Sequence, residues 1–451
     1  MLEDEMRDSN KNQSHSWLYE NFFHELKHII ATNYNIGDLM DIEQIHLGTV
    51  NKSFIIRTVD KNKKKSYFFR KYNPGKTKNE IEFEHSVITH LKKKRFAIVA
   101  QFIHTKDGKT FVNRNKGQNH FYAIFDILSG KDKYSWNNTD CLKNDLKNAG
   151  GVLAKFHNIV FDLKPEQKRC EPKIMDLLPR IVQNISRCAK KKGETPFDIC
   201  LRKNLDVILS TSNQTSNAFV CGVQESKYKD LVQMVIHCDF HPGNIKFQNN
   251  TITGLFDFDW SKVDVRCFDV ALAITYFCAI WKENGDGSLH MEKASIFFQA
   301  YQKACATEPG PLNGTELKYL PHMIKAANIY VMNWVICDFY NGENDTTPCI
   351  SLEYLQHYCR SIQWLDKKCN FKTLGKLFQK QYYRDPRLAL DTDFQKADSI
   401  HCFCSEKQIN EANTLIRSSI DDRSVHQHMA QAAKLTEKMG ESVIVSARKS
   451  L

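Results

Sequence analysis

The sequence lacks any apolar stretch of the about 18 residues that a membrane-spanning helix requires. The best candidate, residues 270–280, is shorter and is flanked by Asp269 and Lys282. The first thirty residues are polar and of mixed charge, without the apolar segment typical of an export signal. We therefore expect a cytoplasmic protein that makes no membrane contact.

Glycine and proline are also scarce, at 19 and 11 of 451 residues, which excludes a collagen-like or low-complexity chain. The 15 cysteines are odd in number and follow no regular spacing. Because no export signal accompanies them, we interpret them as reduced thiols and not as a disulfide framework. Apolar residues make up 42% of the chain, which is enough to bury a large core.

The net charge of +11 comes largely from short lysine runs at 61–65, 92–95 and 190–192. Such runs are typical of solvated loops and of helix C-termini, where cations interact favourably with the helix dipole. No aromatic residues alternate with them, so we expect no nucleic-acid partner. An anionic small ligand such as a nucleotide would suit this charge.

The chain divides into a strand-rich front and a helix-rich back. Alternating, aromatic-rich segments predict the strands, and a period of 3.6 residues predicts the helices. The expected strands are 44–47, 53–59, 66–72, 121–128, 234–236, 245–247 and 251–258, with a hairpin of 99–104 and 110–113; the expected helices are 17–30, 78–91, 140–156, 177–191, 270–281, 291–304, 320–339 and 351–364.

The most informative run is 235–245, which contains Asp239 and Asn244 and is followed 13 residues after Asn244 by Asp257. A Pro-Gly pair keeps this run irregular, and Asp257 ends a hairpin strand that can fold back beside Asn244. Asn244 and Asp257 would then offer the hard oxygen ligands that Mg²⁺ takes when substrate phosphates complete its shell. Asp239 is left to accept a proton from a substrate hydroxyl. These are the parts that phosphoryl transfer requires.

Each of these residues also has a purely structural interpretation. Asp239 could cap a turn, and Asp257 could pair with a surface lysine, but the joint spacing after two apolar strands favours chemistry. We interpret His237 as structural and His241 as a partner in a loop hydrogen bond. Asp259 is left open between assisting the metal and facing solvent.

The pattern His237-x-Asp239-x-x-x-x-Asn244 followed by Asp257 resembles the catalytic loop and metal motif of the aminoglycoside phosphotransferase and choline kinase-like superfamily. The run 264–271 also resembles the segment that opens the next helix in that superfamily. The resemblance implies an ATP-dependent phosphotransferase that uses Mg²⁺.

The resemblance covers roughly residues 35–365. It implies an α+β, two-lobed, protein-kinase-like fold, with a strand-rich N-lobe over 31–128 that binds the nucleotide and a helix-rich C-lobe over 129–384. Residues 1–30 would be a leader and helix, and residues 385–451 a polar extension whose role the sequence leaves open.

The resemblance also implies roles for individual residues. The superfamily residue that matches Asp239 is the catalytic base, and those that match Asn244 and Asp257 hold Mg²⁺. The residues that match His237 and Asp269 are expected to brace the loop.

In the front half, the superfamily places a basic side chain on a strand against the phosphates and holds it with a Glu from the next helix. Arg70 and Lys71 both remain open for this position, with Arg70 preferred. Glu84, a carboxylate on the apolar stripe of its helix, is the matching partner. Gly48 and Asn51 are expected in the nucleotide loop.

By analogy with the fold, the backbone of Asp126 and Ile127 should form the hinge that reads adenine. The acceptor is expected to be the hydroxyl of a small metabolite: a homoserine-like amino alcohol, a sugar or an aminoglycoside. Homoserine is the first guess because the run 70–75 resembles type II homoserine kinases. Five residues are candidates for the acceptor wall: Trp260, Asp264, Tyr330, Trp334 and Asp338.

Two alternatives remain at this point, a nucleotide-binding scaffold without turnover and a protein kinase. A protein kinase is disfavoured because no Gly-rich loop, D-F-G or A-P-E element is found. The sequence does not indicate an oligomeric state.

Overall fold

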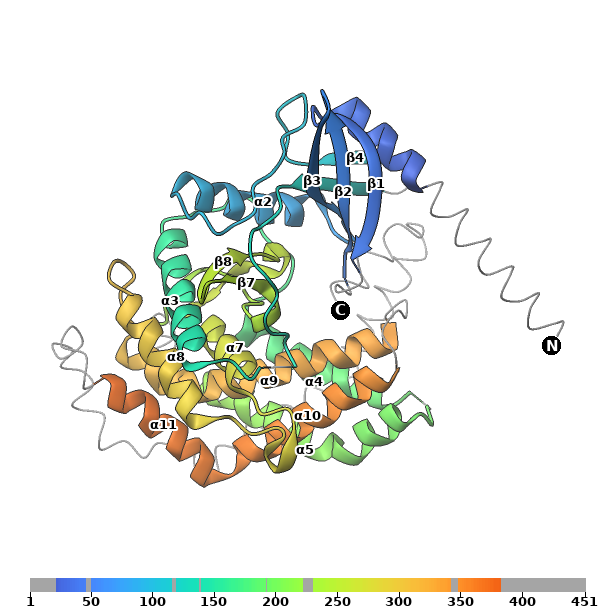
Figure 1. The fold of residues 1–451 in the computed structure, drawn as a ribbon. Coiled ribbons are helices and arrows are strands. Elements are labelled where there is room, and N and C mark those ends of the chain that lie inside the picture. Colours follow the sequence, from blue (N-terminus) through green and yellow to red (C-terminus); the bar gives the residue numbers. More distant parts are fainter. Residues whose placement is uncertain are drawn as a thin grey trace.

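The computed structural model describes residues 22–45, 50–115, 119–137, 139–191, 193–221, 230–341 and 348–382. These residues form a small strand-rich lobe, the N-lobe, above a larger helical lobe, the C-lobe (Figure 1). The N-lobe contains a helix over 22–33, β1 (Asp38–Ile45), β2 (Lys52–Asp60), β3 (Lys63–Lys71), α2 (Lys78–Lys93), β4 (Val112–Asn115) and β5 (Asn119–Phe125).

The N-lobe strands form one antiparallel sheet in the order β1-β2-β3-β5-β4. A tight turn joins β2 to β3, with both Lys61 and Asn62 at positive φ, as two-residue hairpin turns require. Alternate residues of β2, such as Phe54 and Ile56, are buried against the helix over 22–33. This face of the sheet therefore has its own small core.

The other face of the sheet carries α2, whose N-terminus is closed by a capping box between Thr77 and Glu80. The buried side of α2 includes Ile81, Ile88 and the carboxylate of Glu84. The apolar neighbours orient the helix, so that Glu84 is brought beneath the sheet.

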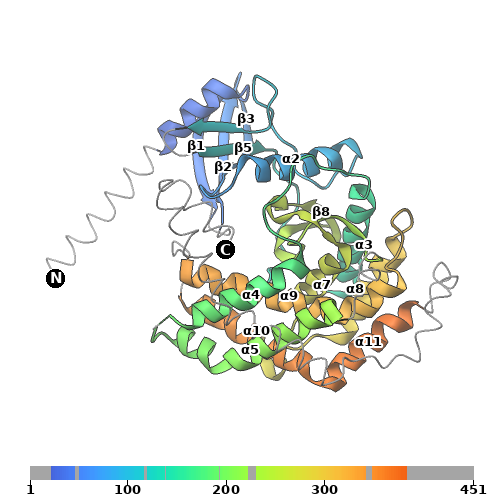
Figure 2. The ribbon, with the colours of Figure 1, turned by 180° about the vertical axis from the view of Figure 1, so that it is seen from behind.

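The C-lobe contains α3 (Lys143–Val160), α4 (Ile174–Ala189), α5 (Pro196–Cys221), α7 (Arg266–Cys278), α8 (Met291–Ala304), α9 (Gly314–Asn341), α10 (Pro348–Asp366) and α11 (Lys368–Tyr382). Every residue of α7 is buried, which makes it the central helix of this lobe. Seen from behind, α4 and α5 lie side by side on one flank (Figure 2).

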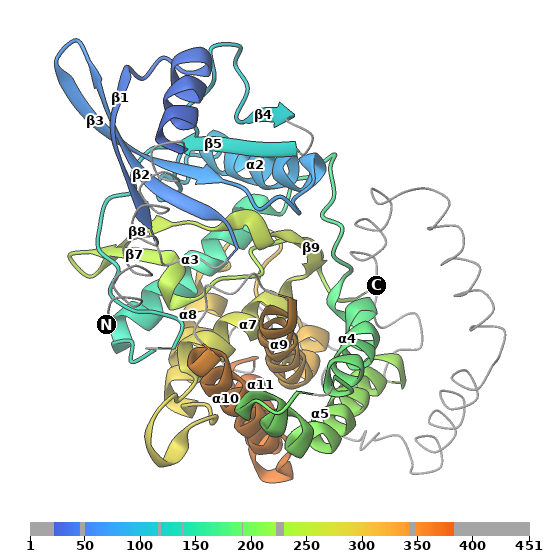
Figure 3. The same ribbon diagram turned by 90° about the vertical axis from the view of Figure 1, so that its right-hand side faces the viewer.

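Two short antiparallel pairs lie where the lobes meet: β6 (Gln233–Ile236) with β9 (Lys262–Val265), and β7 (Ile245–Gln248) with β8 (Thr251–Leu255). Figure 3 shows β7 and β8 directly beneath the N-lobe sheet. The loops that leave β6 and β8 therefore face the junction.

Several predicted elements were wrong or missed. The hairpin of 99–104 and 110–113 does not form, because Val99 bridges to Leu255 and Phe102 bridges to Phe125. The strand expected at 44–47 begins instead at Asp38. Helix α5 was missed because it is rich in Asn, Ser and Thr, which are poor helix formers, and packing on α4 and α10 stabilises it.

None of the helices in the described part of the chain is both long and apolar enough to cross a membrane.

Candidate active site

The loop after β6 is held in place by a carboxylate from the buried helix α7. Asp269 accepts hydrogen bonds from the backbone N–H groups of His237 and Cys238, each at 2.8 Å. Its Oδ2 also lies 3.0 Å from Nε2 of His157, on α3. Cys238 has a φ of 63°, a strained conformation for a residue other than glycine. Asp269 thus braces the turn that presents the next residue, Asp239.

Asp239 and Asn244 are in direct contact. Nδ2 of Asn244 donates to the backbone oxygen of Asp239 at 2.9 Å and to its Oδ2 at 2.8 Å. Because the amide nitrogen is used in this way, the carbonyl oxygen of the Asn244 side chain is available to a cation. The ring of His241 accepts from the N–H of Gly243 at 3.0 Å, and burial lowers the pKa of His241 to about 3, so this ring is neutral.

Asp257 lies beside this pair because β7 and β8 are neighbours. The N–H of Phe256 donates to the backbone oxygen of Asn244 at 3.2 Å. Asp257 itself has a φ of 68°, in the left-handed region. Burial, together with the neighbouring Asp257 and Asp259, raises the pKa of Asp239 well above its usual range. The structure therefore brings Asp239, Asn244 and Asp257 together.

The N-lobe supplies a buried cation to the same place. Nη1 of Arg70 lies 3.0 Å from Oε1 of Glu84, and Nη2 lies 3.0 Å from Oδ1 of Asp257. Burial raises the pKa of Glu84 to about 7, although Arg70 opposes this shift. Lys71 points to the other face of the sheet, where its Nζ lies 5.3 Å from the ring of Phe22. Of the two open candidates, the structure thus places Arg70 in the site.

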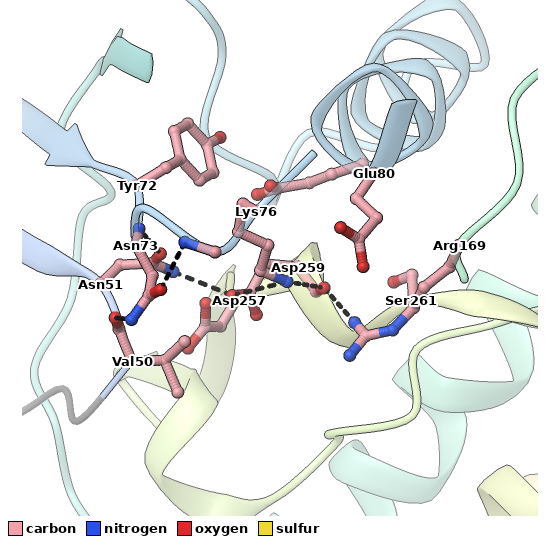
Figure 4. A network of polar contacts seen from close by, with 12 residues as sticks. Val50, Asn51, Tyr72, Asn73, Lys76, Glu80, Arg169, Asp257, Asp259 and Ser261 are labelled. Carbon is pink, nitrogen blue, oxygen red and sulfur yellow. Dashed lines mark hydrogen bonds and ion pairs between the residues drawn. The ribbon is translucent and has the colours of Figure 1, made fainter. Parts of the chain in front are cut away.

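A second set of contacts joins the lobes through Asp259 (Figure 4). Nδ2 of Asn51 donates to Oδ2 of Asp259 at 2.8 Å. Nζ of Lys76 donates to the backbone oxygen of Asp259 at 2.9 Å, and Arg169 donates to the same oxygen. Asp259 is only 5% exposed, so the alternative in which it faces solvent is wrong.

Lys76 and Arg169 were missed in the sequence. Lys76 follows a Pro-Gly pair and Arg169 lies in a polar connecting segment, so neither belongs to a recognisable motif. A cation in a loop carries no periodic signal, and only its three-dimensional neighbours reveal its place.

The predicted hinge follows directly after β5. Asp126 is hydrogen-bonded to Gln101, in the segment before β4. Its N–H donates to the Gln101 backbone oxygen at 3.0 Å, and its Oδ1 accepts from the Gln101 N–H at 2.6 Å. The side chain of Ile127 is 44% exposed. The backbone N–H of Asp126 is therefore already used within the N-lobe, and the reading of adenine by this stretch stays a prediction. Gly48 lies outside the described residues, so its place in a nucleotide loop stays a prediction.

One candidate for the acceptor wall is wrong. Asp264 is fully buried, accepts from the N–H of Ile174 at 2.7 Å and pairs with Lys262 at 3.1 Å. Of the aromatic candidates, Trp260 lies beside Arg169, and the hydroxyl of Tyr330 lies 3.9 Å from Cys238 Sγ. The ring of Trp334 packs 5.8 Å from that of Trp136.

The oxygen donors suit Mg²⁺. Asn244 would contribute an amide oxygen, and Asp257 would contribute a carboxylate of which one oxygen is taken by Arg70. No cluster of three or more His, Cys, Asp or Glu in the described ranges could hold a metal by itself. Mg²⁺ commonly takes only one or two protein oxygens when nucleotide phosphates provide its remaining ligands, so Asn244 and Asp257 fit the ion.

Comparison with known proteins gives the family and the fold of the chain. The profile described as "Phosphotransferase enzyme family" matches residues 41–301. A homoserine kinase of Bradyrhizobium sp. (strain ORS 278) is 26% identical over 317 residues, covering 70% of this chain and 85% of that protein. A homoserine kinase of Parvibaculum lavamentivorans is 24% identical over 324 residues, covering 70% of this chain and 86% of that protein.

Two solved structures illustrate the likeness of fold. The amicoumacin kinase hAmiN, in complex with AMP-PNP and Ca²⁺, has a TM-score of 0.54 at 15% identity and covers 76% of this chain and 93% of its own. Choline kinase from Cryptosporidium parvum has a TM-score of 0.55 at 13% identity and covers 80% of this chain and 99% of its own. The expected α+β, two-lobed, kinase-like fold is confirmed.

Proposed function

This chain belongs to the phosphotransferase enzyme family, and we propose that it transfers the terminal phosphate of ATP to a hydroxyl of homoserine or a closely related amino alcohol. The family membership makes it a small-molecule kinase, and the homoserine kinase relatives support the choice of acceptor. The single observation that carries the proposal for the site is that Asn244, which donates to Asp239, also accepts from Phe256, the neighbour of the Asp257 that pairs with Arg70.

The nucleotide would lie between the lobes, with its phosphates between Arg70 and the C-lobe oxygens. Arg70 is held at this point by Glu84 and Asp257, so its charge is positioned beside the proposed phosphate site. Asn244 and Asp257 would hold Mg²⁺. When bound, this ion neutralises negative charge on the phosphates and orients them for transfer.

Asp239 would accept the proton of the acceptor hydroxyl as that oxygen attacks the terminal phosphorus in line. Burial and the neighbouring carboxylates raise the pKa of Asp239, which makes it a stronger proton acceptor than a solvated aspartate. Asn244 donates to Oδ2 of Asp239 and fixes the orientation of the carboxylate. The proton therefore has a defined destination within the site.

The test is ADP release from MgATP with a panel of acceptors: homoserine, choline, ethanolamine, a sugar and an aminoglycoside. D239N should lower kcat by about 10³-fold with the best acceptor, because general-base catalysis supplies about that factor. It should still bind ATP, as measured by calorimetry. D206N makes the same change at an exposed position of α5 and serves as the control.

Undiminished turnover by D239N would contradict the assignment of the base. If the wild-type protein binds MgATP and turns over none of the acceptors, a nucleotide-binding scaffold becomes the better interpretation.

A further inference from the structure

The segment between α3 and α4 is fixed beside the catalytic loop. Glu171 Oε2 pairs with Nζ of Lys262 at 2.9 Å, and the hydroxyl of Tyr330 lies 3.2 Å from both carboxylate oxygens of Glu171. Lys262 is 2% exposed, so this anchor is deeply buried. The position of Arg169, two residues before the anchor, is therefore determined by the fold of the C-lobe.

The guanidinium of Arg169 is held but not saturated. One nitrogen donates to the backbone oxygen of Asp259, and Cζ lies 4.5 Å from the centroid of the Trp260 ring. An arginine has five N–H donors. Its Nε is buried and has no hydrogen-bond partner among the described residues. A buried donor without a partner is costly, so a ligand that accepts from it would be favoured.

A second cation reaches the same point from the other lobe. Nζ of Lys76 lies 2.9 Å from the oxygen that Arg169 contacts and 5.6 Å from the centroid of the Trp260 ring. The Lys76 side chain is only 11% exposed. Figure 4 shows both cations approaching Asp259, one from each lobe. Nζ of Lys76 also lies 3.6 Å from Oδ2 of Asp259, so the Asp259 carboxylate already balances one of the two positive charges. A second anion beside the pair would balance the other.

The cation pair adjoins the proposed chemistry. Trp260 follows Asp257 by three residues, and the hydroxyl of Tyr330 links Glu171 to Cys238, the neighbour of Asp239. An acceptor with its hydroxyl at Asp239 could extend its far end toward this pair.

We propose that Arg169 and Lys76 form a subsite for the carboxylate of the acceptor, so that the enzyme selects amino-acid acceptors over amino alcohols without a carboxylate. This inference rests on the proposed function and narrows its substrate class. Arg169 donates hydrogen bonds from its unsaturated guanidinium to the carboxylate, and Lys76 adds a second positive charge from the N-lobe. No bond is made or broken at this subsite; it positions the acceptor.

The test compares homoserine with 3-amino-1-propanol, which is homoserine without its carboxylate. The wild-type enzyme should have the higher kcat/KM for homoserine. R169Q should reduce the ratio of the two kcat/KM values about 10- to 100-fold, the range expected for loss of a hydrogen bond to a charged group. R169K should retain part of the preference, and K76Q should reduce it less than R169Q does.

R180Q is the matched control, because Arg180 lies on an exposed face of α4 and the substitution is the same. It should leave the ratio unchanged. Thermal melting of every variant shows whether the fold is kept.

Several outcomes would overturn the subsite. Equal use of the two acceptors by the wild-type enzyme would do so, as would an unchanged ratio in R169Q or turnover only with acceptors that lack a carboxylate. A rise in the KM for ATP that is the same with both acceptors would assign the cations to the nucleotide phosphates instead. Absence of turnover with every acceptor would instead contradict the proposed function itself, and the subsite would fall with it.

Discussion

The two lobes contribute different charges to the site: the proposed base and metal ligands lie in the C-lobe, which also holds Arg169, and the other cations lie in the N-lobe. The C-lobe provides the oxygens of Asp239, Asn244 and Asp257, all on loops within 19 consecutive residues. The N-lobe provides the cations Arg70, on a strand, and Lys76, on a loop. A metal site needs ligands that converge within a few ångströms, and one tight hairpin achieves this, whereas a cation can act on an anionic ligand from any element that faces the site.

The lobes also differ in how they hold these groups. In the C-lobe, Asp269 on the fully buried helix α7 fixes the catalytic loop through two backbone N–H groups. In the N-lobe, Glu84 holds Arg70 through side chains alone. The catalytic loop is thus held through its main chain, whereas Arg70 is held by side-chain pairs. We expect substitutions in the two lobes to have effects of different size.

The largest effect is expected at Asp257. D257N removes the charge proposed to hold the metal, and turnover should fall about 10³-fold, with a weaker dependence of nucleotide binding on Mg²⁺. Initial rates and calorimetry at several Mg²⁺ concentrations measure both. D132N, at an exposed C-lobe position paired with Lys246, is the control. Turnover by D257N within tenfold of the wild-type value would contradict the proposal that Asp257 of the C-lobe holds the metal.

A smaller effect is expected in the N-lobe, where two adjacent residues form a natural pair. Arg70 faces the site and Lys71 faces the helix over 22–33. R70M should lower kcat/KM for ATP about 10²-fold, because a charged contact to the phosphates is lost. K71M should change kcat/KM for ATP by less than about threefold, because Lys71 lies on the other face of the sheet and its loss removes only a surface charge. Equal losses of kcat/KM in R70M and K71M would contradict the prediction that only the cation facing the site contacts the phosphates.

The smallest effect is a pH dependence of stability located in the C-lobe. Burial, followed by the nearby charges of Lys325 and Lys318, lowers the pKa of His322 to about 4 from the usual value of 6.5. The unfolded chain binds the proton below pH 6.5, whereas the folded chain resists it. Stability is therefore full above about pH 6.5 and is lost as the pH falls toward 4.

Between pH 7 and pH 4.5 this histidine should cost about 2 kcal/mol of the free energy of unfolding. Urea denaturation at the two pH values measures the loss. H322F places an apolar ring among Phe219, Tyr319 and Phe371 and should reduce the loss by that amount. An identical pH dependence in H322F would assign the acid sensitivity to other groups.

Some features of the two lobes could be predicted from the sequence and others could not. The residues proposed for the base and the metal were identified together, because their chemistry is compressed into one run with a fixed spacing. Glu84 was recognised as a carboxylate on an apolar helix stripe. The pairing of 99–104 was predicted wrongly, and α5 was missed, because both depend on distant partners that no local pattern records.

By itself, the sequence determined the order of strands and helices in outline, the catalytic run around Asp239 and the presence of a basic strand opposite it. Tertiary structure alone decided that Arg70 and not Lys71 enters the site, that Asp259 joins the lobes, and that Lys76 and Arg169 meet at Trp260. The physical reason is the separation along the chain of the residues that interact. Hydrogen-bond geometry along a short loop is set by neighbouring residues, whereas the meeting of charges separated by more than ninety positions depends on how two cores pack against each other.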